Sequence, residues 1–178
     1  MTEKIILDLD KKIEFKFTEN NLNIAHEIIS RYPEERKRSA VMPLLFLAQK
    51  QQNGNWISKS AIEHIASLLD IYPRDVHEVA TFYTMYNLAP VGKYTIEVCR
   101  TTPCYLCNSE RVLQSIMHNL NIKIGETTND GLFTLIEAEC LGACVNAPIV
   151  KINDNYYENI DSIKIVTLLD ELKSIIQQ

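Results

Sequence analysis

Hydrophobic residues between positions 18 and 89 recur every three or four residues in four separate segments, the pattern of amphipathic helices. Thr18, Ser39 and Ser58 each precede one segment and are suitable helix N-caps, and Pro73 stands at a first-turn position of the fourth. The residues predicted to face inward are Leu22, Ala25, Ile28, Ile29, Tyr32, Val41, Leu44, Leu45, Ala48, Ile62, Ile65, Ala66, Leu69, Val76, Val79, Ala80 and Tyr83. Because the connections are short, we expect residues 18–89 to form a compact helical bundle.

From residue 90 onward the pattern changes to short strands alternating with helices. Strands are predicted at 93–99, 132–139, 149–152 and 156–158, and helices at 109–120 and 161–176. This order predicts a small sheet flanked by helices in a domain at 90–178, so the chain as a whole is expected to be an α+β protein. The first 17 residues alternate hydrophobic and polar positions, which predicts an arm or hairpin at 1–17.

Composition and charge exclude several classes of function. The 178 residues include 46% hydrophobic and 23% charged side chains, as in ordinary globular proteins, and no apolar run approaches the ~18 residues of a membrane span. The first residues resemble neither a signal peptide nor a transit peptide. The net charge is −5, and residues 126–171 carry nine acidic side chains against two lysines. This acidic excess argues against nucleic acid and fits a surface that docks on a basic protein, or one that simply keeps the chain in solution.

All five cysteines lie in the second half of the chain, at positions 99, 104, 107, 140 and 144. Disulfides are not expected in a chain without a secretory signal and with an odd cysteine count. Each group of cysteines follows a predicted strand, so we expect thiolates to converge on a metal. Spacing alone fits structural zinc and an iron–sulfur cluster equally well.

The loops around the cysteines favour a cluster over zinc. Residues 100–103 and 141–143 are mostly small and can turn backbone amides inward, and Gly142 can adopt a positive φ without steric cost. The bridging sulfides of a cluster accept such hydrogen bonds, whereas a single zinc ion needs fewer donors.

Two sets of ligands are compatible with the spacing. Cys99, Cys104 and Cys107 with one distant cysteine reproduce the C-x4-C-x2-C…C pattern of plant-type ferredoxins. Alternatively, Cys99 and Cys104 form one pair and Cys140 and Cys144 another. In the first set, one of the two cysteines that flank a glycine-bearing turn would not be a ligand. We therefore prefer the second set of ligands.

Four segments of the sequence resemble one protein family. They are Val79-Ala80-Thr81-Phe82-Tyr83-Thr84-Met85-Tyr86-Asn87, Pro90-Val91-Gly92-Lys93-Tyr94, Thr101-Thr102-Pro103-Cys104 and Glu139-Cys140-Leu141-Gly142-Ala143-Cys144-Val145-Asn146-Ala147-Pro148. Together they are similar to the 24 kDa subunit of respiratory NADH dehydrogenase, the bacterial form of which belongs to NADH-quinone oxidoreductase. The resemblance runs from about residue 18 to residue 160.

The resemblance implies a helical bundle followed by a thioredoxin-like domain that holds one [2Fe–2S] cluster. The four ligands of that family fall on Cys99, Cys104, Cys140 and Cys144, whereas Cys107 is not at a ligand position. The resemblance also implies a cis peptide bond before Pro148. The chain would then have no catalytic residues of its own.

The same resemblance implies the setting in which the chain works. It would exchange electrons with the FMN of an NADH-binding flavoprotein subunit, beside other peripheral-arm subunits. NAD and FMN would be held by the partner, since the chain has no G-x-G-x-x-G loop. The expected location is cytoplasmic, on the inner face of the plasma membrane through the complex and without a membrane span of its own.

Three other functions stay open from the sequence. The same type of subunit serves soluble NAD-linked hydrogenases and formate dehydrogenases. A zinc-stapled interaction module would use the same four thiolates without redox chemistry. Cys104 and Cys107 form a C-x-x-C pair typical of dithiol oxidoreductases, but this function leaves three cysteines unexplained.

Overall fold

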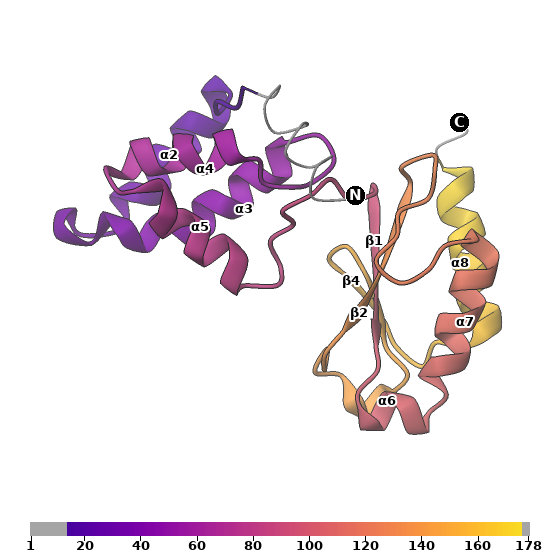
Figure 1. Ribbon diagram of the computed structural model, residues 1–178. Helices are drawn as coiled ribbons and strands as arrows, with labels where there is room; N and C mark the ends of the chain where they lie inside the picture. Colours follow the sequence, from indigo (N-terminus) through magenta and orange to yellow (C-terminus); the bar gives the residue numbers. More distant parts are fainter. Residues whose placement is uncertain (1–13, 176–178) are drawn as a thin grey trace. The chain divides into compact units, whose positions relative to one another are not determined.

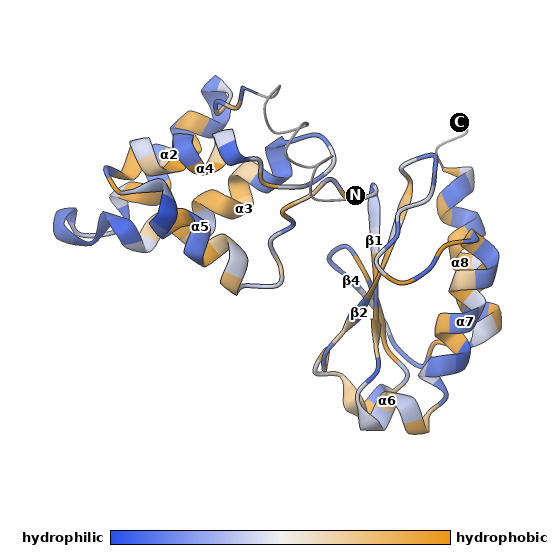
Figure 2. Ribbon diagram, in the orientation of Figure 1, coloured by the Kyte–Doolittle hydropathy of each residue, from blue (hydrophilic) through white to orange (hydrophobic). Residues whose placement is uncertain are grey.

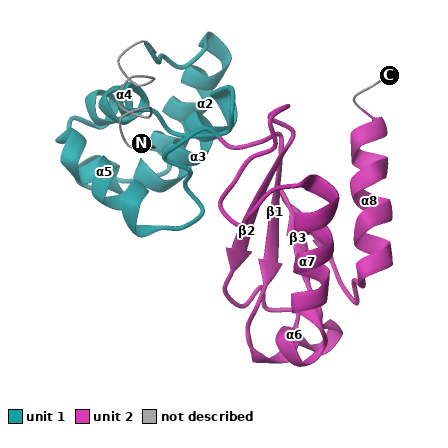
Figure 3. Cartoon of the chain, turned by 45° about the vertical axis from the view of Figure 1, so that its right-hand side comes forward, with its two compact units in different colours: residues 1–90 teal, residues 91–178 magenta. Residues whose placement is uncertain are grey.

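The computed structural model describes residues 14–175, which divide into two compact units at Pro90 and Val91 (Figure 3). The predicted hairpin or arm at 1–17 lies almost entirely outside the described residues. Of its hydrophobic positions, Phe15 and Phe17 are described, and both side chains are buried. Their rings pack edge to face against each other and against the His64 ring.

The first unit is helical, as the hydrophobic pattern predicts. Its α-helices are α2 (Glu19–Ser30), α3 (Val41–Gln51), α4 (Lys59–Leu69) and α5 (Pro73–Phe82), and a 3-10 helix covers Glu34–Ala40. Thr18 and Ser58 cap α2 and α4 through their side-chain oxygens, and Pro73 occupies the first turn of α5. Buried aliphatic side chains from α3, α4 and α5 form the core of this unit.

Two details of the first unit differ from the prediction. Ser39 does not cap α3, because the 3-10 helix that contains it continues directly into α3 and leaves no free helix start at that residue. Tyr83 does not face the core, because α5 ends at Phe82 and the Tyr83 side chain is 37% exposed.

The second unit is a four-stranded sheet with helices against one face (Figure 1). The strands are β1 (Tyr94–Cys99), β2 (Phe133–Ala138), β3 (Val150–Ile152) and β4 (Asn155–Tyr157), in the order β2-β1-β3-β4. Strands β1 and β2 are parallel, and the other two pairs are antiparallel. The helices are α6 (Thr102–Leu106), α7 (Ser109–Leu120) and α8 (Ser162–Ser174).

The core of the second unit lies between the sheet and the paired helices α7 and α8. Ile96, Val98, Leu135 and Val150 project from the strands into this core, and all four side chains are fully buried. Figure 2 shows hydrophobic residues along these strands and along α3 of the first unit.

No helix within residues 14–175 is long and apolar enough to cross a membrane.

Candidate metal centre

The parallel pairing of β1 and β2 brings both groups of cysteines to one edge of the sheet. Cys99 is the last residue of β1 and lies opposite Ala138, the last residue of β2. Cys104 follows in α6, and Cys140 follows β2 by two residues. Because parallel strands end at the same edge, two loops far apart in sequence meet there.

Helix α6 was not predicted from the sequence. We expected residues 100–103 to be a loop, whereas Thr102–Leu106 is helical with Pro103 in its first turn. Five residues are too few to show a helical period, so the hydrophobic pattern carries no signal for this helix.

The first pair of cysteines is buried. Cys99 and Cys104 are 1% and 0% exposed, and their thiols are hydrogen-bonded to each other. They pack with Ile149 in a small group of buried residues, and Leu141, Ala143 and Ala147 pack against this group. The peptide bond that follows Ala147 is cis, as the resemblance predicts.

The second pair is nearer the surface. The sulfur atoms of Cys140 and Cys144 are 3.3 Å apart, Cys140 is exposed and Cys144 is half-buried. Cys144 begins a short 3-10 helix that ends at Asn146. Gly142, between the two cysteines, has a φ of +85°, as its place in the turn predicts.

The two pairs belong to one site. The Thr101 hydroxyl lies 3.3 Å from the sulfur of Cys99 and also hydrogen-bonds Cys140. Cys99 interacts electrostatically with both Cys140 and Cys144. Sequence reasoning did not single out Thr101, because a hydroxyl in a loop gives no signal until the opposite loop is placed beside it.

Cys107 lies outside this group. It is exposed and follows the last residue of α6. It borders a pocket of about 260 Å³, lined also by Asn108, Arg111, Pro148 and Asp161.

Within each pair, the pKa of one thiol is raised and the pKa of the other is lowered. Burial raises the pKa of Cys104 to about 11, and so does the hydrogen bond that its thiol donates to Cys99. Burial also raises the pKa of Cys99, but hydrogen bonds from Thr101 and from the amide of Leu141 outweigh it and lower that pKa. The Gly142 amide lowers the pKa of Cys140, whereas the hydrogen bond donated to Cys140 raises the pKa of Cys144.

These contacts fit an iron–sulfur cluster. A [2Fe–2S] cluster needs four thiolates shared between two irons, together with donors to its sulfurs. Two cysteine pairs meet the first requirement. Backbone amides that point at the cysteine sulfurs, as the loop composition predicts, meet the second.

A small sheet with two cysteine loops at one edge defines a thioredoxin-like iron–sulfur protein. The family model of the thioredoxin-like [2Fe-2S] ferredoxin matches residues 25–173, and the chain belongs to this family. Its relatives include the E subunit of NADH-quinone oxidoreductase from Rickettsia prowazekii, 54% identical over 88% of both chains. The corresponding protein of Rickettsia bellii, with the same name, is 51% identical over 92% of this chain and 98% of its own.

A solved structure shares the fold. A chain of an NAD+-reducing [NiFe]-hydrogenase in the H2-reduced state superimposes with a TM-score of 0.65 over 74% of this chain and 22% of that chain. Its identity is 19%, so this likeness concerns the fold alone.

The comparisons confirm the family, the α+β fold with its thioredoxin-like domain, and the electron-transfer role in an NADH-quinone oxidoreductase. Family membership also supports a [2Fe–2S] cluster rather than zinc. The four ligands, the domain limits and the flavoprotein partner stay predictions.

Proposed function

We propose that Cys99, Cys104, Cys140 and Cys144 bind the [2Fe–2S] cluster through which this chain carries electrons in an NADH-quinone oxidoreductase. The observation that carries the proposal is the meeting of two cysteine pairs at one sheet edge, joined through Thr101. We propose that Cys107, which is exposed and follows the last residue of α6, is not a ligand.

The cluster, when bound, accepts and releases a single electron. The protein supplies a fixed frame for it. Cys99 and Cys104 are held in the buried core at the sheet edge, and the amides of Leu141 and Gly142 donate toward the sulfurs of Cys99 and Cys140. Donors of this kind favour the thiolate form that iron requires.

The surface side of the site suits electron exchange with a partner protein. Cys140 is exposed, and next to the cysteines the side chains of Tyr105, Leu106 and Val145 are 58%, 75% and 98% exposed. Such an apolar rim is typical of a surface that another protein covers. We infer that an NADH-binding flavoprotein subunit docks here, with its FMN as the electron donor.

The helical unit is proposed to offer a docking surface of its own to the complex. We assign residues 18–89 to the bundle, 90–178 to the cluster domain and 1–17 to an arm or hairpin. The bundle exposes large side chains at the end of α5 and just beyond it: Phe82 is 78% exposed, Tyr83 37% and Met85 43%. Other peripheral-arm subunits would complete the assembly, on the cytoplasmic face of the membrane.

Co-expression with the FMN subunit tests the proposed function. The isolated chain should show no NADH–ferricyanide reductase activity, because FMN and the NAD site are proposed to belong to the partner subunit. The two subunits together should form a stable heterodimer with that activity, whose [2Fe–2S] EPR signal appears on reduction with NADH or dithionite. Oxidation of NADH by the isolated chain, or failure to co-purify with the flavoprotein, would refute the carrier function.

A further inference from the structure

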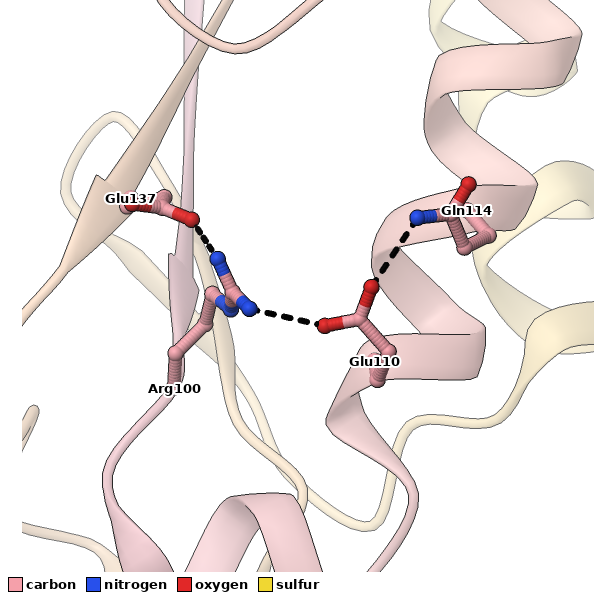
Figure 4. Close-up of polar contacts among 4 residues, drawn as sticks. All are labelled: Arg100, Glu110, Gln114 and Glu137. Atoms are coloured by element: carbon pink, nitrogen blue, oxygen red, sulfur yellow. Dashed lines mark hydrogen bonds and ion pairs between the residues drawn. The ribbon is translucent and has the colours of Figure 1, made fainter.

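An arginine links the two strands that lead into the cysteine loops. Arg100 follows Cys99, and its guanidinium lies between Glu137 of β2 and Glu110 of α7 (Figure 4). One guanidinium nitrogen is paired with Glu137, and the other is 2.9 Å from Glu110. Gln114 donates a hydrogen bond of 2.9 Å to the second oxygen of Glu110.

The ion pairs of Arg100 with Glu110 and Glu137 contribute little to the stability of the fold. The side chains of Arg100, Glu110 and Glu137 are 37%, 40% and 42% exposed, and ion pairs this open to water typically contribute about 0–1 kcal/mol. The position of these charges in the chain is more informative than their contribution to stability. Arg100 directly follows Cys99 in the sequence, and Glu137 is three residues before Cys140.

Electrostatics connects this group with electron transfer. Two ferric ions, two sulfides and four thiolates sum to a charge of −2, and the electron accepted from a reduced flavin makes it −3, with no bond formed or broken. Nearby carboxylates oppose the added negative charge, and a nearby cation favours it. With Arg100 present, the three side chains carry a net −1. Without it, they carry −2.

We propose that Arg100 raises the reduction potential of the cluster by neutralising Glu137 and Glu110 at the sheet edge. Arg100 is not a ligand of the cluster. Its positive charge acts on the reduction potential of the cluster from beside the site. This inference rests on the proposed ligand set, which places the cluster beside Cys99.

The test is an EPR-monitored redox titration of the full-length chain with its cluster. In Arg100→Gln, the ratio of reduced to oxidised cluster at a fixed ambient potential should fall about fivefold, the effect of one unit charge near a site of intermediate dielectric. For a one-electron couple this corresponds to about 40 mV. Arg100→Lys, which keeps the charge, should stay close to wild type.

Removing a carboxylate should have the opposite effect. Glu137→Gln should raise the potential, and the double variant Arg100→Gln/Glu137→Gln should return most of the way to wild type. Lys173→Gln is the matched control, because Lys173 has a similar exposure of 35% and pairs with Asp170 and Asn119 at the far end of α7. It should leave the potential unchanged.

The outcomes separate this inference from the proposed function. An unchanged or raised potential in Arg100→Gln, with the cluster intact, overturns the inference alone. If Arg100→Gln loses the cluster, Glu137→Gln decides: a raised potential supports the inference, and any other result overturns it. A wild-type chain without a [2Fe–2S] spectrum overturns the proposed function as well, and that result is seen before any variant is made.

Discussion

Gly142→Ala is expected to weaken cluster binding without removing any ligand. Gly142 has a φ of +85°, and among residues 14–175, its two chain neighbours aside, a Cβ added there would meet no atom within 4 Å. The cost is therefore the backbone conformation itself, about 1–2 kcal/mol for a residue with a Cβ in the left-handed region. That free energy lowers the population of the turn that directs the Gly142 amide at Cys140 by a factor of about 5–30.

The assay is the loss of visible [2Fe–2S] absorbance in the presence of an iron chelator. We expect Gly142→Ala to lose its cluster several-fold faster than wild type. Gly142→Asn should be less affected, because asparagine tolerates a positive φ better than alanine does. The thiol ligands are the same in all three proteins, so a difference reports on the turn.

Two glycines elsewhere in the same unit provide matched controls. Gly125 and Gly131 have φ values of +82° and +70°, and a Cβ at either would also meet nothing within 4 Å. Gly125→Ala and Gly131→Ala should lower the stability of the unit by a similar amount and leave cluster loss at the wild-type rate. Equal rates of loss in Gly142→Ala and both controls would refute a special role for this turn.

Three further changes test the fold. Ser58→Ala should lower the free energy of unfolding by about 0.5–2 kcal/mol in chemical denaturation because Ser58 caps α4, whereas the exposed Ser39→Ala should have almost no effect. Ile96→Ala, at a fully buried position, should cost about 2–5 kcal/mol, and Ile163→Ala, at a position 78% exposed, far less; thermal unfolding distinguishes them. Burial raises the pKa of Tyr86 to about 12, above its value in the unfolded chain, so its neutral form stabilises the fold up to about pH 10 and that contribution is lost as pH rises toward 12. Tyr86→Phe should remove this part of the alkaline loss of stability, and an unchanged pH profile would contradict the assignment.

The parts of the fold that local chemistry determines could be predicted from the sequence. Thr18 and Ser58 cap helices through their own side chains, within three residues of the helix start, so the pattern identifies them. Ser39 has the same chemistry but lies inside a 3-10 helix, which the hydrophobic pattern did not reveal. Local signals indicate where a helix can begin, and they do not say whether another helix already continues through that point.

Some features of the candidate site could likewise be predicted from the sequence, and others could not. The grouping of the cysteines and the positive φ of Gly142 follow from residue types and spacing. The contacts of Thr101 with both pairs, and of Arg100 with Glu137, depend on the parallel register of β1 and β2, which places Cys99 opposite Ala138. Arg100 and Glu137 are 37 residues apart in the sequence, so no local pattern predicts their contact.

Analysis of iron, acid-labile sulfide and zinc tests the central claim most directly, in anaerobically purified wild-type chain and in two matched variants. Wild type and Cys107→Ser should each hold about two irons and two sulfides per chain, and Cys144→Ser should lose most of both. Stoichiometric zinc without sulfide in wild type would contradict a cluster. Loss of the cluster in Cys107→Ser, with retention in Cys144→Ser, would contradict the four proposed ligands.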